Sequence, residues 1–257
     1  MHANIIKLKI MKIGIIGFGR VGSSLFDFLE EKNLIVSPYS KSKRIGDFKR
    51  VILDSEIIFI CVKDDLIPER VRKIDKLEIN NKKHFIHLSG ATPLPLLDPL
   101  KRKGHYTGKL HPIQSFSERN KEAFKNIYAT FSGDKETLNI LKDIFGKDLK
   151  IIELKEREQL LIHIACVFAS NFPVYSIIKA EEILEKLNLE REILNPLIKT
   201  SIYNVIEKGA KNSLTGPAKR RDIRTIRVHK KILKNFKKDI YSIYNYLTKK
   251  ILDERGL

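Results

Sequence analysis

Two histidines and an asparagine are the side chains best suited to acid–base chemistry in this chain. His111 stands before a proline in the segment LHPIQSF, which holds it in extended backbone. His163, Ser170 and Asn171 fall at positions i, i+7 and i+8 of an apolar helical segment, so they share one stripe. An imidazole can donate a proton near neutral pH, and an amide can orient a carbonyl group. We therefore predict His111, His163 and Asn171 as catalytic residues, with a structural core histidine as the alternative for each imidazole.

A glycine-rich turn near the N-terminus predicts a dinucleotide-binding site. The strand-like run Ile13–Ile16 leads into GFGRVG at residues 17–22, and an amphipathic helix over 23–32 follows. In this setting the first glycine makes a tight turn, the second lets backbone N–H groups approach a pyrophosphate, and the third allows close helix–strand packing. A turn without a ligand is the alternative. The predicted cofactor-binding residues here are Gly17, Phe18, Gly19, Arg20, Val21 and Gly22.

The end of the second predicted strand indicates which dinucleotide binds. An NAD site places an acidic residue about twenty residues after the first glycine, whereas a 2′-phosphate needs cations or hydroxyls. Here the segment SPYSKSKR occupies residues 37–44, and the first acid is Asp47. We therefore predict NADP, with Ser40, Lys41 and Ser42 among the cofactor-binding residues; solvated loop charges are the alternative. Val62 and Asp64, which close and follow a buried run, are predicted to flank the same cofactor.

Two further segments carry groups that bind carbonyls or anions. Ser89 and Gly90 follow the apolar run Phe85–Leu88, where a hydroxyl at a strand end would reach nicotinamide or substrate, unless the segment is an ordinary turn. The loop LTGPAKRRD at residues 214–222 places a hydroxyl and adjacent cations before a helix. Such a cluster suits a carboxylate or phosphate, and arginine binds these groups bidentately. We predict Ser89 as catalytic and, as substrate-binding residues, Ser170, Thr215, Lys219 and Arg220.

Hydrophobic periodicity divides the chain into two domains. Residues 11–153 alternate apolar strands with amphipathic helices, which predicts an α/β Rossmann domain. Residues 154–257 show helical periodicity without strand signals, beginning with a long helix from Glu156 to Leu187 that is kinked at Pro173. We therefore predict an all-α second domain, preceded by the α/β domain and by a short tail over residues 1–10.

Composition narrows the classes of protein. The formal net charge is +18, but the excess of basic residues is spread through both domains, which disfavours nucleic acid as a partner. We find no apolar run long enough to span a bilayer and no signal-peptide pattern, and we expect a soluble, cytoplasmic protein without a membrane partner. Cys61 and Cys166 each lie in apolar segments, so we expect buried thiols rather than a disulfide, and no metal site is indicated.

Seven ordered segments together resemble the Rossmann-like proteins that carry the domain of unknown function DUF2520. These proteins are relatives of pyrroline-5-carboxylate reductase, ketopantoate reductase and the 6-phosphogluconate dehydrogenase-like group. The resemblance implies an NADP-binding domain, followed by a helical domain like the C-terminal domain of 6-phosphogluconate dehydrogenase that forms a homodimer, with the active site between domains. The last segment departs from the family pattern, because Arg221 stands where glycine is usual. The segments are GFGRVGSSL, YSKS, VKDDLI, HLSG, HPIQSF, HIACVFASN and LTGPAKRRD.

The resemblance also implies a reaction. Ketopantoate reductases typically carry a helical lysine four residues before the asparagine, but Val167 occupies that place here, so His163 or His111 would have to replace the lysine. The favoured interpretation is an NADPH-dependent reductase of a small 2-oxo acid, and the expected reaction is ketopantoate reduction in pantothenate biosynthesis. The alternatives are a pyrroline-5-carboxylate-type imine reductase and a non-catalytic NADP-binding regulatory protein whose basic segment, Lys219–Lys238, contacts a polyanion.

Overall fold

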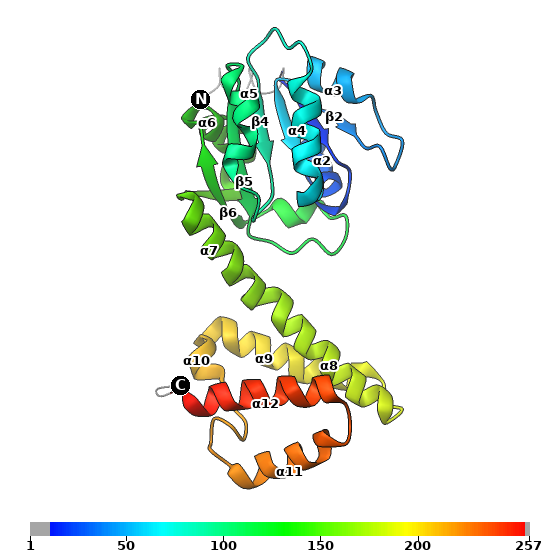
Figure 1. Cartoon of the computed structure of the whole chain (residues 1–257), viewed down its shortest axis with the longest axis vertical. Helices are drawn as coiled ribbons and strands as arrows, with labels where there is room; N and C mark the ends of the chain where they lie inside the picture. The colour runs from blue at the N-terminus through cyan, green and yellow to red at the C-terminus, as the bar shows by residue number, and fades with distance from the viewer. Residues whose placement is uncertain (1–10, 255–257) are drawn as a thin grey trace. The chain divides into compact units, whose positions relative to one another are not determined.

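A seven-stranded sheet dominates the N-terminal part of the chain (Figure 1). The computed structural model describes residues 11–254, so the predicted tail over residues 1–10 lies outside the described residues. The strand order is β2-β1-β3-β4-β5-β6-β7; β6 runs antiparallel to β5, and every other neighbouring pair is parallel. The strands are β1 Lys12–Ile16, β2 Ile35–Tyr39, β3 Ile57–Ile60, β4 His84–His87, β5 Tyr106–Pro112, β6 Ile127–Gly133 and β7 Leu149–Glu153.

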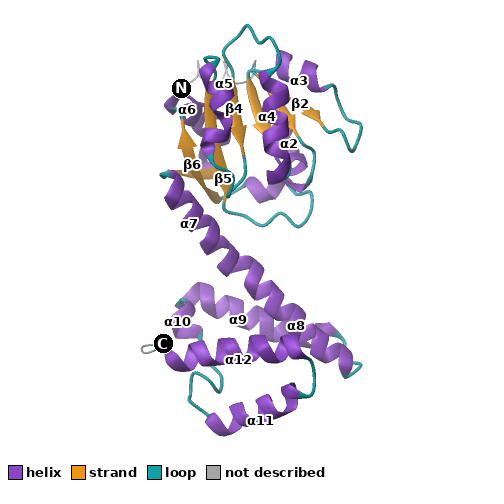
Figure 2. Cartoon of the chain, viewed as in Figure 1, coloured by secondary structure: helices purple, strands orange, loops and turns teal. Residues whose placement is uncertain are grey.

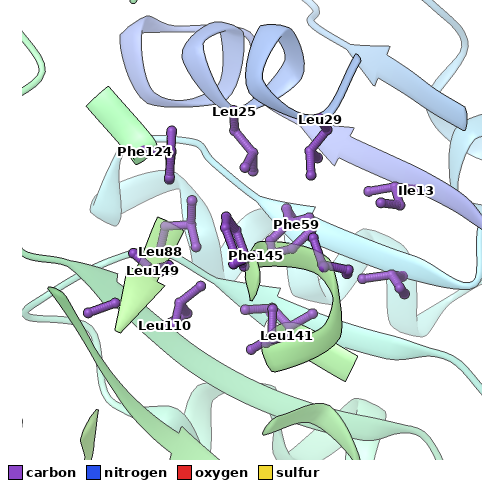
Figure 3. Packing of buried hydrophobic residues seen from close by; sticks show 14 of the residues in the cluster. Ile13, Leu25, Leu29, Phe59, Leu88, Leu110, Phe124, Leu141, Phe145 and Leu149 are labelled. Carbon is purple, nitrogen blue, oxygen red and sulfur yellow. The ribbon is translucent and has the colours of Figure 1, made fainter. Parts of the chain in front are cut away.

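Helices cover both faces of this sheet, which is why its central strands are continuous apolar runs. One face packs against α2 (Arg20–Glu31), the short η3 (Lys121–Phe124) and α6 (Lys135–Phe145). In that layer, side chains of α2 and α6 meet strand residues such as Ile13 and Phe59 (Figure 3). The other face packs against α3, α4 and α5. The remaining elements of this part are α3 Phe48–Asp54, η1 Asp64–Leu66, α4 Ile67–Asp75, η2 Leu94–Leu97, α5 Asp98–Arg102 and η4 Gly146–Asp148.

The chain divides into two compact units, the first ending at Asn171 and the second running from Phe172. The first unit therefore extends past residue 153 and includes α7 (Glu156–Cys166) and η5 (Val167–Asn171). Gln159 is one residue that joins α7 to the sheet: it is fully buried and accepts a hydrogen bond from the Ser132 hydroxyl at 2.8 Å.

The described residues of the second unit form helices joined by loops, with no strand among them (Figure 2). This arrangement confirms the predicted fold class, an α/β Rossmann domain followed by helices. The elements are α8 Phe172–Lys186, η6 Arg191–Leu194, α9 Asn195–Lys208, α10 Ala210–Ser213, α11 Ile223–Lys234 and α12 Lys238–Asp253.

The long helix predicted over 156–187 is present, but its irregularity differs from the predicted kink at Pro173. Residues Val167–Asn171 form a π-helix between α7 and α8. Proline has no N–H, so Pro173 cannot donate to the carbonyl of Ala169 in the α-helical pattern, and the ladder readjusts just before it. The π-helix contains Ser170 and Asn171, and single π-turns inside α-helices are frequent at functional sites.

The same helix corrects one expectation. Among residues 11–254, the helix Glu156–Lys186 is long and apolar enough to cross a membrane by length and composition, so the expectation that no such run exists was wrong. Its apolar stretch over residues 160–178 contains His163, Ser170 and Asn171 but no lysine, arginine, aspartate or glutamate. Length and composition alone do not distinguish a membrane span from a helix covered by another protein surface.

Candidate functional site

The carboxyl ends of β1, β2 and β3 border a cavity of about 1120 Å³ in the first unit. Ligands of open α/β sheets bind outside this edge, at the point where strand order reverses, as it does here between β1 and β3. Gly22 and Asp64 do not line the cavity, whereas Lys63 and Asp65 do. The other predicted cofactor residues line it: Gly17, Phe18, Gly19, Arg20, Val21, Ser40, Lys41, Ser42 and Val62.

The three glycines of the turn differ in what surrounds them. Gly17 has a φ of +107°, which disfavours any side chain, and a Cβ there would lie 2.6 Å from the Cys61 carbonyl oxygen. A Cβ on Gly22 would lie only 2.0 Å from the carbonyl oxygen of Gly17, so α2 packs directly on the turn. A Cβ on Gly19 would meet nothing within 4 Å. Gly22 is therefore a packing residue, while Gly19 faces open space.

The open space at Gly19 suits an anion. Helix α2 begins at Arg20, and its N-cap, Gly19, has no side chain to accept hydrogen bonds from the first-turn N–H groups. The first N–H groups of a helix lack intrahelical partners, and the helix dipole favours negative charge at this end. The turn can thus accommodate an anion such as a pyrophosphate.

The turn after β2 carries hydroxyls and cations, and the nearest acidic residue after it is engaged in a hydrogen bond to the backbone. Ser40 is buried, and its backbone pairs with Ile45 through hydrogen bonds of 2.9 and 3.0 Å, which closes the turn. The hydroxyls of Ser40 and Ser42 lie 3.4 Å apart. Asp47, the first acid, accepts a 2.7 Å hydrogen bond from the Arg50 N–H as the N-cap of α3 and does not line the cavity. This environment suits a 2′-phosphate better than a ribose hydroxyl.

The structure brings His111 and His163 together, although the sequence pointed to each one separately. The Nδ1 atom of His163 lies 3.4 Å from the Nε2 atom of His111, and the two rings are edge to face with centroids 5.0 Å apart. His111 comes from the end of β5 and His163 from α7. Gly90, in the segment after β4, lies against both rings. The pair therefore lies at the carboxyl end of β5, which is also the edge of the sheet that borders the cavity.

His111 is held neutral. Burial is the main cause that lowers the pKa of His111 to about 4; His163 and Lys109 act in the same direction, and the Leu88 backbone hydrogen bond and Asp64 oppose the shift. At neutral pH this ring has one N–H group and one unprotonated nitrogen that can accept a hydrogen bond. It can therefore receive a proton from, or share one with, His163.

The other predicted polar residues of the first unit have identified contacts. The Ser89 hydroxyl accepts hydrogen bonds from the N–H groups of Ala91 and Thr92, at 3.2 and 2.8 Å, and keeps its own proton available. The Ser170 hydroxyl lies 2.7 Å from the Cys166 carbonyl oxygen and 2.9 Å from Oδ1 of Asn171, which is exposed. Ser89 thus stabilises the turn after β4, and Ser170 orients the amide of Asn171.

Sequence reasoning missed a buried polar layer beneath α7. Lys109 of β5 is 1% exposed and pairs in register with His87 of β4, which is fully buried. The sequence contained an indication of this layer. Lys109 and His111 are two residues apart in β5, so their side chains lie on the same face of the strand. Burial lowers the pKa of Lys109, and the nearby Glu156 and Asp64 oppose the shift. The layer therefore places a buried cation beside the histidine pair.

Three predicted substrate-binding residues lie in the second unit. Thr215, Lys219 and Arg220 occupy the loop between α10 and α11, and Thr215 and Arg220 are exposed. Arg221, which replaces the usual glycine, adopts the left-handed conformation with a φ of +56°, so the loop keeps the backbone geometry that glycine favours.

Gly90→Ala is expected to separate the histidine pair. The added Cβ would lie 2.3 Å from Nδ1 of His163 and 2.9 Å from Cε1 of His111, so at least one ring must move. A displacement of about 1 Å at a catalytic group costs roughly 10²-fold in rate. We expect a corresponding fall in kcat with a thermal unfolding temperature close to that of the wild type. A kcat equal to that of the wild type would show that the pair tolerates the displacement.

Acid is expected to destabilise the protein in part through His87. Its two ring nitrogens have no hydrogen-bond partner within the described structure, and burial, assisted by Lys109, lowers its pKa to about 3. The unfolded state therefore binds more protons than the folded state between pH 6.5 and about 3, so stability falls as pH falls through this range. Replacing His87 by leucine should leave stability at pH 7 unchanged or raised and reduce the loss at pH 5. Urea unfolding at both pH values measures this, and an undiminished acid loss would contradict it.

Comparison with known proteins relates part of the chain to one family model. The fold and the glycine-lined cavity define a Rossmann-like protein. Residues 127–251, just under half of the chain, match the model of a domain of unknown function, DUF2520, the same domain that the resemblance indicated. The match begins at β6, within the sheet. No curated protein matches the sequence.

Solved structures share the fold over nearly the whole chain. A Bacteroides fragilis protein with the provisional name NADP oxidoreductase is 23% identical, with a TM-score of 0.84, covering 96% of this chain and 100% of that one. A Thermotoga maritima protein is also 23% identical, with a TM-score of 0.68 and coverage of 94% and 98%. The NADP-bound pyrroline carboxylate reductase of Plasmodium falciparum is 18% identical, with a TM-score of 0.61 and coverage of 96% and 100%.

Proposed function

We propose that the protein is an NADP-dependent oxidoreductase that reduces a small substrate carrying a carbonyl or imine group. The observation that carries this proposal is that one edge of one sheet holds both an anion-binding glycine turn and a histidine pair. The fold is shared with a protein whose structure contains bound NADP, which supports the same cofactor here. The turn over residues 40–42, which carries two hydroxyls and one ammonium group, favours the phosphorylated dinucleotide.

The cavity residues have distinct roles in this proposal. The backbone at Gly17, Gly19 and Arg20 would hold the pyrophosphate, and Ser40, Lys41 and Ser42 would hold the 2′-phosphate. Val62 and the rest of the β3 end would flank the nucleotide.

The histidine pair would act as the general acid that protonates the substrate. When bound, the reduced nicotinamide supplies a hydride to the substrate carbon, and negative charge develops on the carbonyl oxygen. A positioned donor to that oxygen contributes about 10² to 10⁴ in rate. His163, which contacts neutral His111, would donate the proton, and Asn171 and Ser89 would orient the substrate. Arg220 or Lys219 would hold the substrate carboxylate, and Ser170 and Thr215 remain predicted substrate-binding residues.

The proposed substrate is a 2-oxo acid, with ketopantoate as the first choice because of the family resemblance. The second candidate, pyrroline-5-carboxylate, is favoured by the structural similarity to a pyrroline carboxylate reductase. Purified protein offered each compound with NADPH, with oxidation followed at 340 nm, separates the two. Turnover of neither compound, together with salt-sensitive DNA binding, would favour the non-catalytic regulatory protein instead.

We also propose a cytoplasmic homodimer formed through the helical segments, without membrane or nucleic-acid partners. Large apolar side chains of α9, including Leu197, Tyr203 and Ile206, are exposed. Exposed apolar surface of this kind is typical of an interface with another protein chain. Light scattering in detergent-free buffer should give twice the mass of the 257-residue chain. A monomer that floats with lipid vesicles would instead favour membrane attachment.

A further inference from the structure

A buried arginine outside the predicted cofactor residues lies in the wall of the cavity. Arg70 belongs to α4 and falls on the buried stripe of that helix together with Ile67, Val71 and Ile74. The residue is 8% exposed, and its Nε atom has no hydrogen-bond partner within residues 11–254. A charged group in an apolar stripe is costly unless it is paired. An anionic partner would therefore offset the cost of burying the Arg70 guanidinium.

The carboxylate that the structure offers Arg70 is a poor partner. Glu69, its neighbour in sequence, lies 3.5 Å from the Arg70 guanidinium but 2.8 Å from the Lys73 ammonium. Glu69 thus pairs more closely with Lys73, and the Nε side of the guanidinium remains unused.

The cavity wall beside Arg70 is built from the turn after β2. Arg70, Ser40, Lys41 and Ser42 all line the same cavity. Lys73 and Arg70 lower the pKa of Glu69, and Lys41 contributes in the same direction, which shows that the turn faces the start of α4. Hydroxyls and an ammonium from one side and a buried guanidinium from the other would surround a phosphate with charge-assisted hydrogen bonds.

We propose that Arg70 binds the 2′-phosphate of NADP opposite Ser40, Lys41 and Ser42, and that it determines the preference for NADP over NAD. This inference rests on the proposed cofactor of the cavity. The guanidinium is already ordered by its burial in α4, so little side-chain entropy is lost when the phosphate binds.

Calorimetric titration of the full chain with NADPH, NADH, 2′,5′-ADP and 5′-AMP tests the proposal. Arg70→Met keeps the length of the buried stem and removes the charge, so it should weaken NADPH and 2′,5′-ADP by about 10- to 100-fold, as expected for charged hydrogen bonds. NADH and 5′-AMP lack the 2′-phosphate and therefore lose no contact when Arg70 is replaced. Their affinities should stay within about threefold of those for the wild type. Arg72→Met, an exposed position of the same helix that does not line the cavity, is the matched control and should change none of the four affinities.

The outcomes are distinguishable. Equal loss of NADPH and NADH would mean that Arg70 contacts the shared adenosine and would overturn the proposal, as would unchanged NADPH affinity. Wild-type protein that binds neither dinucleotide would contradict the proposed function instead. Arg70→Lys, which keeps the charge but loses the planar fork, provides the test if the methionine variant fails to fold; it should show a smaller loss of the same two phosphorylated ligands.

Discussion

Gly22→Ala is expected to abolish NADPH binding and to destabilise the protein by at least about 3 kcal/mol, the upper end of common overpacking costs. The new Cβ would lie 2.0 Å from the Gly17 carbonyl oxygen, which is backbone and cannot rotate away. Helix α2 must then move off the turn, and the N–H groups that would hold the pyrophosphate lose their positions. Urea unfolding and fluorescence titration with NADPH measure the two effects.

Gly19→Ala is the matched control for the same turn. Gly19 has a φ of −78°, and a Cβ there meets nothing within 4 Å, so the variant should fold with a stability within about 1 kcal/mol of the wild type. The methyl group would occupy the space proposed for the pyrophosphate and should weaken NADPH by at least about tenfold. Wild-type stability in Gly22→Ala, or wild-type affinity in Gly19→Ala, would contradict the roles given to these two glycines.

His163→Ala is expected to lower kcat by about 10² to 10⁴, the usual contribution of a positioned general acid. His163 does not line the cavity, so the affinity for NADPH should stay within about threefold of that of the wild type. A change of this size is smaller than the tenfold loss that removal of one strong contact would cause. Steady-state kinetics with the preferred substrate and calorimetry with NADPH measure these quantities.

A second histidine provides the control for that prediction. His229 of α11 contacts the Tyr244 hydroxyl at 2.9 Å, so His229→Ala should keep the wild-type kcat. His111→Asn distinguishes the roles within the pair, because the variant that loses more activity identifies the proton donor. Unchanged kcat in both His163→Ala and His111→Asn would remove the pair from the mechanism.

The α/β part could be predicted from the sequence because local rules and the tertiary fold agree there. Residues 13–32 combine a buried strand, a turn that requires glycine and an amphipathic helix, and all three features indicate the same strand–turn–helix unit. The structure gives Gly17 its positive φ and Gly22 its close backbone contact. Helix α3 escaped prediction because it is only seven residues long and exposes most of them.

The features that escaped prediction depend on contacts between distant segments. His111 and His163 are 52 residues apart, and the register of β5 together with the docking of Gln159 brings them together. The layer around Lys109 and His87 depends on which strands become neighbours, and periodicity alone does not specify this. Arg70 was detectable in principle, because it interrupts the apolar stripe that Ile67, Val71 and Ile74 form on α4.

Calorimetric titration of the wild-type chain with NADPH and NADH in the same buffer tests the central claim most directly. The hydroxyls and cations after β2, with Asp47 occupied as the cap of α3, predict saturable NADPH binding and markedly weaker NADH binding. No binding of NADPH, or a clear preference for NADH, would contradict the account.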